Sequence, residues 1–398
     1  MKRKCKKVNI RDFDTIRPWV EDCIMRHKKR YDFRKLLLDN GMTREEYNEA
    51  VKTGKKELYH KAIDRITIEA ANRIGNRNLD LPPVRIREMH DKTTDKIRQI
   101  GWESAMQQVF DYIAVHSCKE IWDARIIREQ ASSIPGRGQV YGMRMIRKAV
   151  KSDYRAERYA KKHGYHYSRK LRYFVKLDIR KCYPSADLGI FMELLKRDCG
   201  NEEIIWLWNE LLSSHKVEDY NGFMIGALIS QWGCQLMLSY IYRYVKSLHY
   251  EKRGRKYKSV QKMYLFMDDM LLFGSNRTEL LKAVRKAIIF TKDKLGFTIK
   301  PNFMIHDFFL TGADMMGFVI YSNGKVEMRN RNYIRSQRLI KRFKRKGYLV
   351  ISQAKRLTSF KGYYVHSNYH GEMGAFRYAQ HLISKEVRNE NNLYRIAG

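Results

Sequence analysis

Three aspartates lie within apolar, strand-like runs, and no other feature of the sequence limits the fold as much. Asp178 lies in Phe174-Val-Lys-Leu-Asp-Ile179, and Asp268-Asp269 lie in Tyr264-Leu-Phe-Met-Asp-Asp-Met-Leu-Leu-Phe273. Burying one uncompensated carboxylate costs several kcal/mol, and a second carboxylate beside it raises that cost. Divalent cations remove the cost, because three carboxylates on two neighbouring strands can hold two Mg²⁺ ions about 4 Å apart.

Each acid also has a simpler interpretation when it is taken alone. Asp178 by itself is typical of a strand end or a turn, and Asp268-Asp269 by themselves suit a solvated hairpin turn. Together, in a basic chain, they favour nucleotidyl transfer, in which one metal ion lowers the pKa of an attacking 3′-hydroxyl and the other neutralises the leaving pyrophosphate. The spacing alone does not identify the class of polymerase.

The charge balance indicates a polyanionic partner. Among 398 residues, 79 are Lys or Arg and 43 are Asp or Glu, which gives a net charge of +36. Such a chain repels itself unless a polyanion shares its surface, so we expect nucleic acid as the partner and disfavour a purely structural or acidic-substrate role. Hydrophobic residues make up 44% of the chain, enough for a sizeable core.

Cysteine usage and hydropathy limit the compartment. The six cysteines show neither CxxC nor Cys/His ligand spacing, which disfavours a zinc site or a disulfide framework and favours a reducing compartment. Asp12 and Asp14 lie where a signal peptide needs an apolar core, and no apolar run approaches the roughly 18 residues of a membrane span. We therefore expect a cytoplasmic protein with no membrane partner.

Hydrophobic periodicity predicts helices and strands in an irregular order, which favours an α+β fold over a repeated βαβ unit. The predicted elements are helices at 47–51 and 58–66, two strands within 84–100 around a turn at 91–95, a helix within 104–129, a loop at 135–138 before a basic helix, a strand at 173–179, helices at 188–197, 204–212 and 228–248, a hairpin at 263–274, a helix at 279–295, strands at 315–321 and 325–328, and a mostly helical tail.

Several short segments add a more specific signal because of their order along the chain. They are Asp91 to Arg98, Ile134-Pro-Gly-Arg-Gly138, Lys176-Leu-Asp-Ile-Arg-Lys-Cys-Tyr-Pro-Ser185, Gly222-Phe-Met-Ile-Gly-Ala-Leu-Ile-Ser-Gln231, Phe266-Met-Asp-Asp269, Leu295-Gly-Phe-Thr-Ile-Lys-Pro-Asn302, Asp314-Met-Met-Gly-Phe318 and Ser359-Phe-Lys-Gly-Tyr-Tyr-Val-His366. In this order they resemble the motifs of the reverse transcriptase family, specifically its compact bacterial members. The resemblance covers roughly residues 82 to 370.

The resemblance implies a right-hand polymerase fold of fingers, palm and thumb, preceded by a helical basic N-terminal region. We expect that region at 1–80, the fingers at 81–170, the palm with finger-side insertions at 171–322, and the thumb and tail at 323–398. The implied activity is RNA-directed DNA synthesis from dNTPs on an RNA template, with a DNA primer and product. The implied cofactor is two Mg²⁺ ions, with Mn²⁺ as a substitute.

The resemblance also implies roles for individual residues. Asp178, Asp268 and Asp269 would be catalytic and would bind the metals together with the carbonyl of Ile179, and Tyr183 would be an aromatic gate that selects dNTPs. The other residues are Lys96, Arg98, Arg137, Ser230, Gln231 and Lys300 for nucleotide binding, and Met316 and Gly317 for the primer grip.

These roles also have simpler alternatives. Tyr183 is otherwise a core tyrosine at a strand end, the single cations are solvated charges, and Ser230-Gln231 is a polar pair at a helix start. Met315, Met316 and Phe318 fit the core beneath a primer grip better than contact with primer bases.

Two substitutions depart from the family pattern. Phe266 replaces the tyrosine of the Tyr-x-Asp-Asp signature, so the ring stays and the hydroxyl is lost, and we expect altered rate or fidelity with activity retained. Met224 replaces a proline in the template-contact segment and puts that loop's rigidity in question. All three carboxylates remain, which favours a competent enzyme.

Two basic segments are candidates for binding nucleic acid. Residues 329–346 hold nine basic residues in eighteen and no acid, and a helix there would present an apolar stripe to the thumb and cationic faces to phosphates. The apolar stripe comprises Tyr333, Ile334, Leu339, Ile340 and Phe343. The second segment, 252–262, is expected on a loop. The cations proposed to bind phosphates are Arg331, Arg335, Arg338, Lys341, Arg342 and Arg345.

The biological setting stays open at this point. No maturase, DNA-binding or endonuclease segment follows the expected thumb, which disfavours a mobile group II intron enzyme. A diversity-generating retroelement, an anti-phage defence system and a retron remain, with a structured noncoding RNA, a small accessory protein or a homo-oligomer as further partners. Other function classes are a catalytically silent RNA-binding protein with a polymerase shell, and untemplated or protein-primed DNA synthesis.

Overall fold

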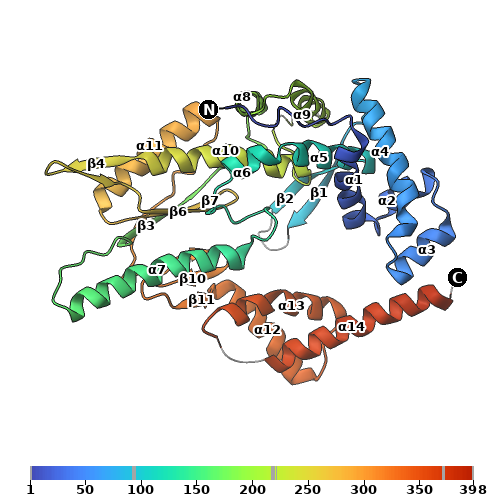
Figure 1. Cartoon of the computed structure of the whole chain (residues 1–398). Helices are drawn as coiled ribbons and strands as arrows, with labels where there is room; N and C mark the ends of the chain where they lie inside the picture. Colours follow the sequence, from blue (N-terminus) through green and yellow to red (C-terminus); the bar gives the residue numbers. More distant parts are fainter. Residues whose placement is uncertain (1, 92–95, 217–219, 221, 370–372, 397–398) are drawn as a thin grey trace. The chain divides into compact units, whose positions relative to one another are not determined.

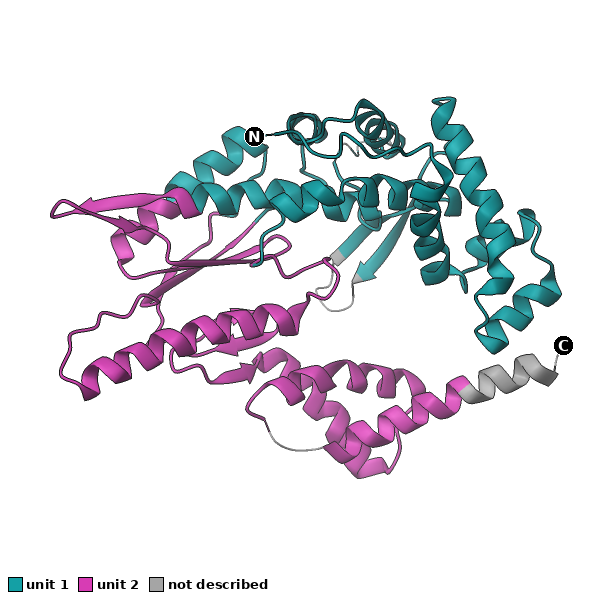
Figure 2. Ribbon diagram, in the orientation of Figure 1, with its two compact units in different colours: residues 1–128, 179–245, 285–300 teal, residues 129–178, 246–284, 301–398 magenta. Residues whose placement is uncertain are grey.

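The computed structural model describes residues 2–91, 96–216, 220, 222–369 and 373–396. The chain divides into two compact units (Figure 2). Unit 1 comprises residues 1–128, 179–245 and 285–300, and unit 2 comprises residues 129–178, 246–284 and 301–398. The predicted turn at 91–95 falls mainly on residues outside the described part, and the predicted division into fingers, palm and thumb stays a prediction.

Helices and short antiparallel strands alternate irregularly along the chain, as predicted for an α+β protein (Figure 1). The helices are α1 Phe13–His27, α2 Tyr31–Asp39, α3 Arg44–Thr53, η1 Glu57–Tyr59, α4 His60–Gly75, α5 Ala105–Ser117, α6 Lys119–Arg125, α7 Gln139–Lys162, α8 Leu188–Asp198, α9 Glu202–Ser214, α10 Leu228–Ser247, α11 Arg277–Leu295, α12 Asn330–Lys346, α13 Ile351–His366 and α14 Met373–Ile396. The strands are β1 Arg85–Asp91, β2 Lys96–Trp102, β3 Tyr173–Asp178, β4 His249–Lys252, β5 Arg255–Lys258, β6 Lys262–Phe266, β7 Asp269–Gly274, β8 Ile305–Asp307, β9 Ala313–Met315, β10 Phe318–Ile320 and β11 Val326–Met328.

Unit 1 is mainly helical, with the β1–β2 hairpin as its sheet. Local sequence explains where its helices begin: Ser104 and Gln107 form a capping box at the start of α5, and Thr43 and Glu46 form one at the start of α3. The side chain of Asn201 accepts hydrogen bonds from two backbone N–H groups of α9. These caps satisfy backbone donors that a helix start leaves free.

Unit 2 is built on a four-stranded antiparallel sheet in the order β6-β7-β3-β8. Because side chains alternate across a strand, Phe174, Leu271 and Phe273 lie on one face of the sheet. That face packs into a buried cluster with α7 and with the small sheet β11-β10-β9. The cluster fixes the register of the strands that carry the predicted carboxylates, since a slip would expose its apolar side chains.

Helices α12, α13 and α14 form a second core within unit 2. Leu339 and Ile340 are buried there, and Tyr333 and Phe343 are partly buried against them, so the predicted helix with an apolar stripe is confirmed. Ile334 was expected in the same stripe and is instead 43% exposed, because its position on the helix points away from the other four.

Two other predictions about elements are wrong. The run 315–321 is not a single strand: Met316 and Gly317 have φ of 56° and 81°, and together they form a two-residue turn between β9 and β10. The segment 252–262 is largely not a loop, because β4 and β5 pair around Arg253 and Gly254, which also have positive φ. Both errors come from turns that lack an obvious Asn-Gly or Asp-Gly signal.

Two further observations concern the whole described chain. The six cysteines are all buried, and none forms a disulfide. Among the residues that the structure describes, no helix has the length and apolarity that crossing a bilayer requires.

Candidate active site

Asp178 and Asp269 face each other at one end of the two central strands of the sheet. Asp178 ends β3 and Asp269 begins β7, and antiparallel pairing makes them register partners. Directly opposed residues project from one face of a sheet with Cβ atoms about 4.5–5.5 Å apart. Like charges at that spacing destabilise the pairing unless a cation compensates them.

Lys176 provides a positive charge beside the pair. It precedes Asp178 by two residues, so the strand places both side chains on one face. Its Nζ lies 3.0 Å from Oδ2 of Asp269, and the two side chains are 35% and 25% exposed. An ion pair that water still reaches contributes only about 0.2–1 kcal/mol. A divalent cation can therefore displace the ammonium group from Asp269 at small cost.

Asp268 belongs to the two-residue turn between β6 and β7. The first turn residue, Met267, has a φ of 51°, a left-handed conformation that costs a non-glycine residue about 1–2 kcal/mol. Strain of this kind is concentrated at functional sites. Phe266 is the register partner of Asp269 and is packed against the buried cluster of the sheet. Its ring therefore contributes apolar packing next to the carboxylates.

The donor set suits a hard divalent cation but forms no complete cage. Among the described residues, no group of three or more His, Cys, Asp or Glu side chains lies close enough to hold a metal ion. The structure thus pairs Asp178 with Asp269 and leaves Asp268 in the adjoining turn, and the meeting of all three at shared ions stays a prediction. Mg²⁺ needs only one or two protein carboxylates, because waters and substrate phosphates complete its shell.

The residues predicted to bind nucleotide lie mostly in unit 1. Ile179 pairs with Ile299 in an isolated antiparallel bridge. Lys300 directly follows Ile299 and therefore lies next to this bridge. Arg98 is exposed on β2, and of Lys96 only the backbone at the start of β2 is described. Arg137 lies instead in unit 2, in the turn before α7, where its Nη1 donates to the carbonyl of Gln130 at 3.1 Å.

The segment 222–231 is tightly held within unit 1. The N–H of Phe223 donates to the carbonyl of Tyr183 at 2.9 Å. A Cβ added at Gly222 would lie 2.4 Å from the carbonyl oxygens of Tyr183 and Pro184, so only glycine fits there. The Met224 side chain is fully buried and packs where a Cβ on Gly101 would be. Packing therefore supplies rigidity that the absent proline does not.

Ser230 and Gln231 lie in the first turn of α10, in agreement with the alternative of a polar pair at a helix start. Ser230 is fully buried, and its hydroxyl has no hydrogen-bond partner in the part of the chain that the structure describes. Tyr183 is half-buried in the turn that leads to α8.

Asp111 is a residue of this region that the sequence interpretation missed. Its Oδ2 accepts hydrogen bonds from the N–H groups of Leu228 and Ile229, at 3.0 and 3.2 Å, and so caps α10 from a different helix. Burial raises the pKa of Asp111 well above its usual range. Its position in the apolar helical run 109–113 was the available signal, the same one that drew attention to Asp178.

Glu103 and His215 are buried beside Asp111. The His215 Nε2 atom lies 2.8 Å from Oε1 of Glu103. Burial raises the pKa of Glu103 to about 7, and burial lowers the pKa of His215. Neutral forms of these groups suit an interior that offers little compensation for charge.

The predicted primer grip is the tight turn between β9 and β10. The side chain of Met316 is 4% exposed, and Met315 and Phe318 are buried as well, so the interpretation of these three as core residues is confirmed. A Cβ on Gly317 would lie 2.6 Å from the ring of Tyr363, which packs on the turn. Any contact of Met316 and Gly317 with a primer must therefore come from their backbone.

The predicted phosphate-binding cations lie on α12. Arg331, Arg338, Lys341, Arg342 and Arg345 are exposed, and Arg335 is half-exposed. They occupy the faces of α12 that its apolar stripe leaves to solvent.

The model of the family described as "Reverse transcriptase (RNA-dependent DNA polymerase)" matches residues 72–302. That match confirms the right-hand polymerase fold predicted from the sequence motifs. No curated protein matches the chain.

Several solved structures are similar to the chain at low sequence identity. A telomerase from Candida albicans in complex with a TWJ fragment of telomeric RNA is 12% identical and has a TM-score of 0.40, with 77% of this chain and 59% of that chain covered. Apo telomerase from Candida tropicalis, truncated from its C-terminal domain, is 13% identical with a TM-score of 0.42, and 71% and 69% are covered. Apo telomerase from Candida tropicalis is 12% identical with a TM-score of 0.38, and 92% and 79% are covered. The chain thus spans 59% of the first of these structures.

Proposed function

Because the chain belongs to the reverse transcriptase family, we propose that it is an RNA-directed DNA polymerase that extends a 3′-hydroxyl with dNTPs on an RNA template. The observation that supports this most directly is the pairing of Asp178 with Asp269 at the ends of β3 and β7. A structural protein gains nothing from two opposed carboxylates at a strand end, whereas nucleotidyl transfer requires such groups to hold divalent cations.

Asp178, Asp269 and Asp268, with the carbonyl of Ile179, are the residues proposed to hold two Mg²⁺ ions. Bound there, the ions would lower the pKa of the primer hydroxyl and neutralise the charge of the leaving pyrophosphate. Strand pairing fixes the backbone positions of Asp178 and Asp269, and the β6–β7 turn fixes the backbone position of Asp268. In this proposal Lys176 gives up Asp269 when a metal binds and remains available to a phosphate oxygen.

The substrate-binding roles remain part of the same proposal. Lys96, Arg98, Arg137 and Lys300 would bind the triphosphate, and Tyr183, Ser230 and Gln231 would orient the nucleotide. Asp111 supports this segment by capping α10, so it acts as a positioning residue through the backbone of Leu228 and Ile229. The exposed cations of α12 would hold the phosphates of template and product.

We also propose the narrower setting suggested by the motifs, a compact bacterial enzyme of an anti-phage defence system, a diversity-generating retroelement or a retron. The support is the order of segments from Asp91–Arg98 to Ser359–His366, together with the segment 222–231. A structured noncoding RNA or a small accessory protein would be its partner in such a system.

The test is dNTP incorporation on a primed RNA template with Mg²⁺, comparing the wild type with Asp268→Ala plus Asp269→Ala. We expect incorporation by the wild type and none by the double variant. Equal incorporation would disprove the assignment of the site, and binding of RNA without incorporation by either protein would favour the silent RNA-binding alternative. Template-free incorporation would instead favour untemplated synthesis.

A further inference from the structure

A cationic pocket lies on α7, in unit 2, and none of the roles described so far involves it. It encloses about 770 Å³. Five of its eight lining side chains are basic and none is acidic. The lining residues are Lys151, Tyr154, Arg155, Arg158, Tyr159, Lys161, Lys162 and Asn323.

The two acids of this part of α7 bind Arg169 and Tyr167 within the fold and pair with none of the cations of the pocket. Asp153 is buried and accepts hydrogen bonds from Tyr167 and from Nε of Arg169, each at 2.8 Å. Glu157 pairs with Nη1 of the same arginine at 3.0 Å. Arg169 is itself buried and donates to the carbonyl of Ser322 at 2.7 Å, beside Asn323 of the pocket.

The basic residues of the pocket have no such compensation. Within the described residues, Lys151, Arg155, Arg158, Lys161 and Lys162 make no ion pair with a carboxylate. Five positive charges thus line one pocket, while the neighbouring carboxylates of Asp153 and Glu157 pair with Arg169. A site with this charge attracts a polyanion, because like charges this close repel one another until an anion binds.

Aromatic rings continue the pocket past the end of α7. Gly164 has a φ of 72°, and the N–H of Tyr165 donates to the carbonyl of Ala160 at 2.8 Å, which turns the chain back on the helix. This turn brings three rings together: His163 is tilted by 39° against Tyr159 at 4.3 Å and stacked on Tyr165 at 6.5 Å, measured between ring centroids. Tyr159 and Tyr165 are 63% and 68% exposed. Exposed aromatic rings beside cations are platforms on which unpaired bases can stack.

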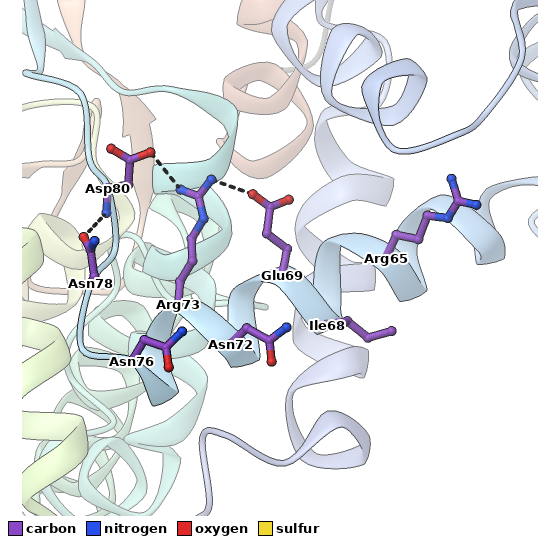
Figure 3. A pocket seen from close by; sticks show the side chains of 8 residues that line it. All are labelled: Arg65, Ile68, Glu69, Asn72, Arg73, Asn76, Asn78 and Asp80. Atoms are coloured by element: carbon purple, nitrogen blue, oxygen red, sulfur yellow. Dashed lines mark hydrogen bonds and ion pairs between the residues drawn. The ribbon is translucent and has the colours of Figure 1, made fainter.

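A second pocket of the chain shows that an excess of cations is not common to all of its pockets. It lies on α4 in unit 1 and encloses about 530 Å³ (Figure 3). Arg73 there pairs with Glu69 at 2.5 Å and approaches Asp80 at 4.0 Å. With Arg65 as its other cation, two acids offset two bases, so this pocket offers no net charge to an anion.

We propose that the α7 pocket binds a single-stranded segment of RNA, with its cations on the phosphates and with bases stacked on Tyr159, His163 and Tyr165. Single-stranded RNA fits better than a duplex, because the bases of a duplex are already stacked on each other and cannot use the rings. An anionic lipid surface would use the cations but not the rings. The site is separate from the carboxylates, and its occupancy does not depend on polymerisation.

The test uses the full chain and a short fluorescent single-stranded RNA, with a blunt RNA duplex of equal length for comparison. Replacing Tyr159 and Tyr165 by alanine should weaken single-strand binding about tenfold or more and leave duplex binding within about twofold. Replacing Lys151, Arg155 and Arg158 by glutamine should lower the salt dependence of single-strand binding by about two in slope, at roughly 0.7 per phosphate contact.

A matched control removes three exposed cations elsewhere, through Arg44→Gln, Lys52→Gln and Lys56→Gln on and after α3. The control should leave the ratio of single-strand to duplex affinity unchanged, and thermal unfolding should verify that each variant is folded. A photoactivatable uridine in the RNA should cross-link to residues 154–165 in the wild type. Unchanged affinity in the tyrosine variant, or cross-links confined to other segments, would overturn the proposal.

Two further measurements separate this site from the polymerase assignment and from a lipid. The Asp268→Ala plus Asp269→Ala protein should keep the single-strand affinity, and the pocket variants should keep incorporation on a short primed template. Phosphatidylserine vesicles should not pull the wild type down through this pocket. Vesicle binding that the glutamine substitutions abolish, with RNA affinity intact, would replace RNA by lipid as the ligand.

Discussion

The chain has carboxylates within apolar segments in two places, and the two places differ in how deeply the carboxylates are buried and in what they contact. In unit 1, Glu103 and Asp111 are buried, and burial raises the pKa of both. In unit 2, Asp178 and Asp269 face each other at strand ends, and Asp269 is 25% exposed with its Oδ2 atom 3.0 Å from Nζ of Lys176. An acid in an apolar run is therefore not in itself a catalytic acid, because burial raises the pKa of Glu103 and Asp111 and so favours their neutral forms.

The largest expected effect concerns chemistry at the strand ends. Asp178→Asn should reduce dNTP incorporation by at least about 10³-fold, because it removes a proposed metal ligand. Its thermal stability should equal or exceed that of the wild type, since one of two opposed charges is lost. Incorporation kinetics and calorimetry on the same preparation measure both. If activity falls only in proportion to the amount of folded protein, Asp178 acts on stability, as the acids of unit 1 do, and the proposed difference between the two units is wrong.

The next effect is a pH dependence carried by Glu103. The folded state keeps this carboxyl protonated up to about pH 7, whereas the unfolded chain releases the proton near its ordinary pKa of 4.5. Its contribution to the free energy of unfolding is therefore full below about pH 4.5 and is lost as the pH rises to 7, by up to about 3 kcal/mol. Denaturant titrations of wild type and Glu103→Gln at pH 5 and pH 8 test this.

The difference between the two proteins isolates Glu103 from the other titrating groups. The wild type should lose more stability than Glu103→Gln between the two pH values, because glutamine has no proton to release. An equal loss in both proteins would mean that Glu103 ionises inside the fold as it does in water.

A smaller effect should follow Asp111→Ala, which removes the cap of α10. Two N–H groups lose their acceptor, and we expect the free energy of unfolding to fall by about 1–3 kcal/mol. Asp111→Asn should stay near the wild type, because burial favours the neutral form of Asp111 and an amide keeps an acceptor oxygen in the same place. An Asn variant as unstable as the Ala variant would show that the ionised form of Asp111 caps α10. The acids of unit 1 would then resemble those of unit 2 in carrying a charge.

The smallest effect concerns the cation beside Asp269. In Lys176→Met, no ammonium competes for the carboxylate, and Mg²⁺ should bind up to about fivefold more tightly, as read from the Mg²⁺-dependent rise in melting temperature. Lys262→Met, an exposed lysine on β6 of the same sheet, is the matched control and should not change the Mg²⁺ response. Weaker Mg²⁺ binding in Lys176→Met would mean that the lysine helps to organise the site.

Long, periodic elements were predictable from the sequence. Helices α8 and α10 and strands β3, β6 and β7 lie within a few residues of their predicted bounds, because apolar spacing decides them. The turn at Met316-Gly317 and the β4–β5 hairpin were not predictable, because residues such as Met316 and Arg253 adopt positive φ only when the pairing of the flanking strands enforces it.

The same distinction holds for the candidate site. Apolar runs around Asp178 and Asp269 predicted two strands, and the structure pairs these residues directly. Asp111 was missed because its partners are backbone groups 117 and 118 residues further along the chain, and a sequence read locally contains no sign of them. The pocket on α7 was missed for a similar reason, since only the fold shows that Asp153 and Glu157 of α7 both bind Arg169 and not the cations of the pocket.

The pairing of β3 with β7 also decides which mutations this protein could survive. A single residue inserted in either strand would turn the remainder to the opposite side of the sheet, so that Leu177 or Met270 would stand in place of an acid. Every proposed metal ligand would still be present in such a protein, yet Asp178 and Asp269 would no longer face each other. Within these strands, evolution can therefore exchange side chains but not change length.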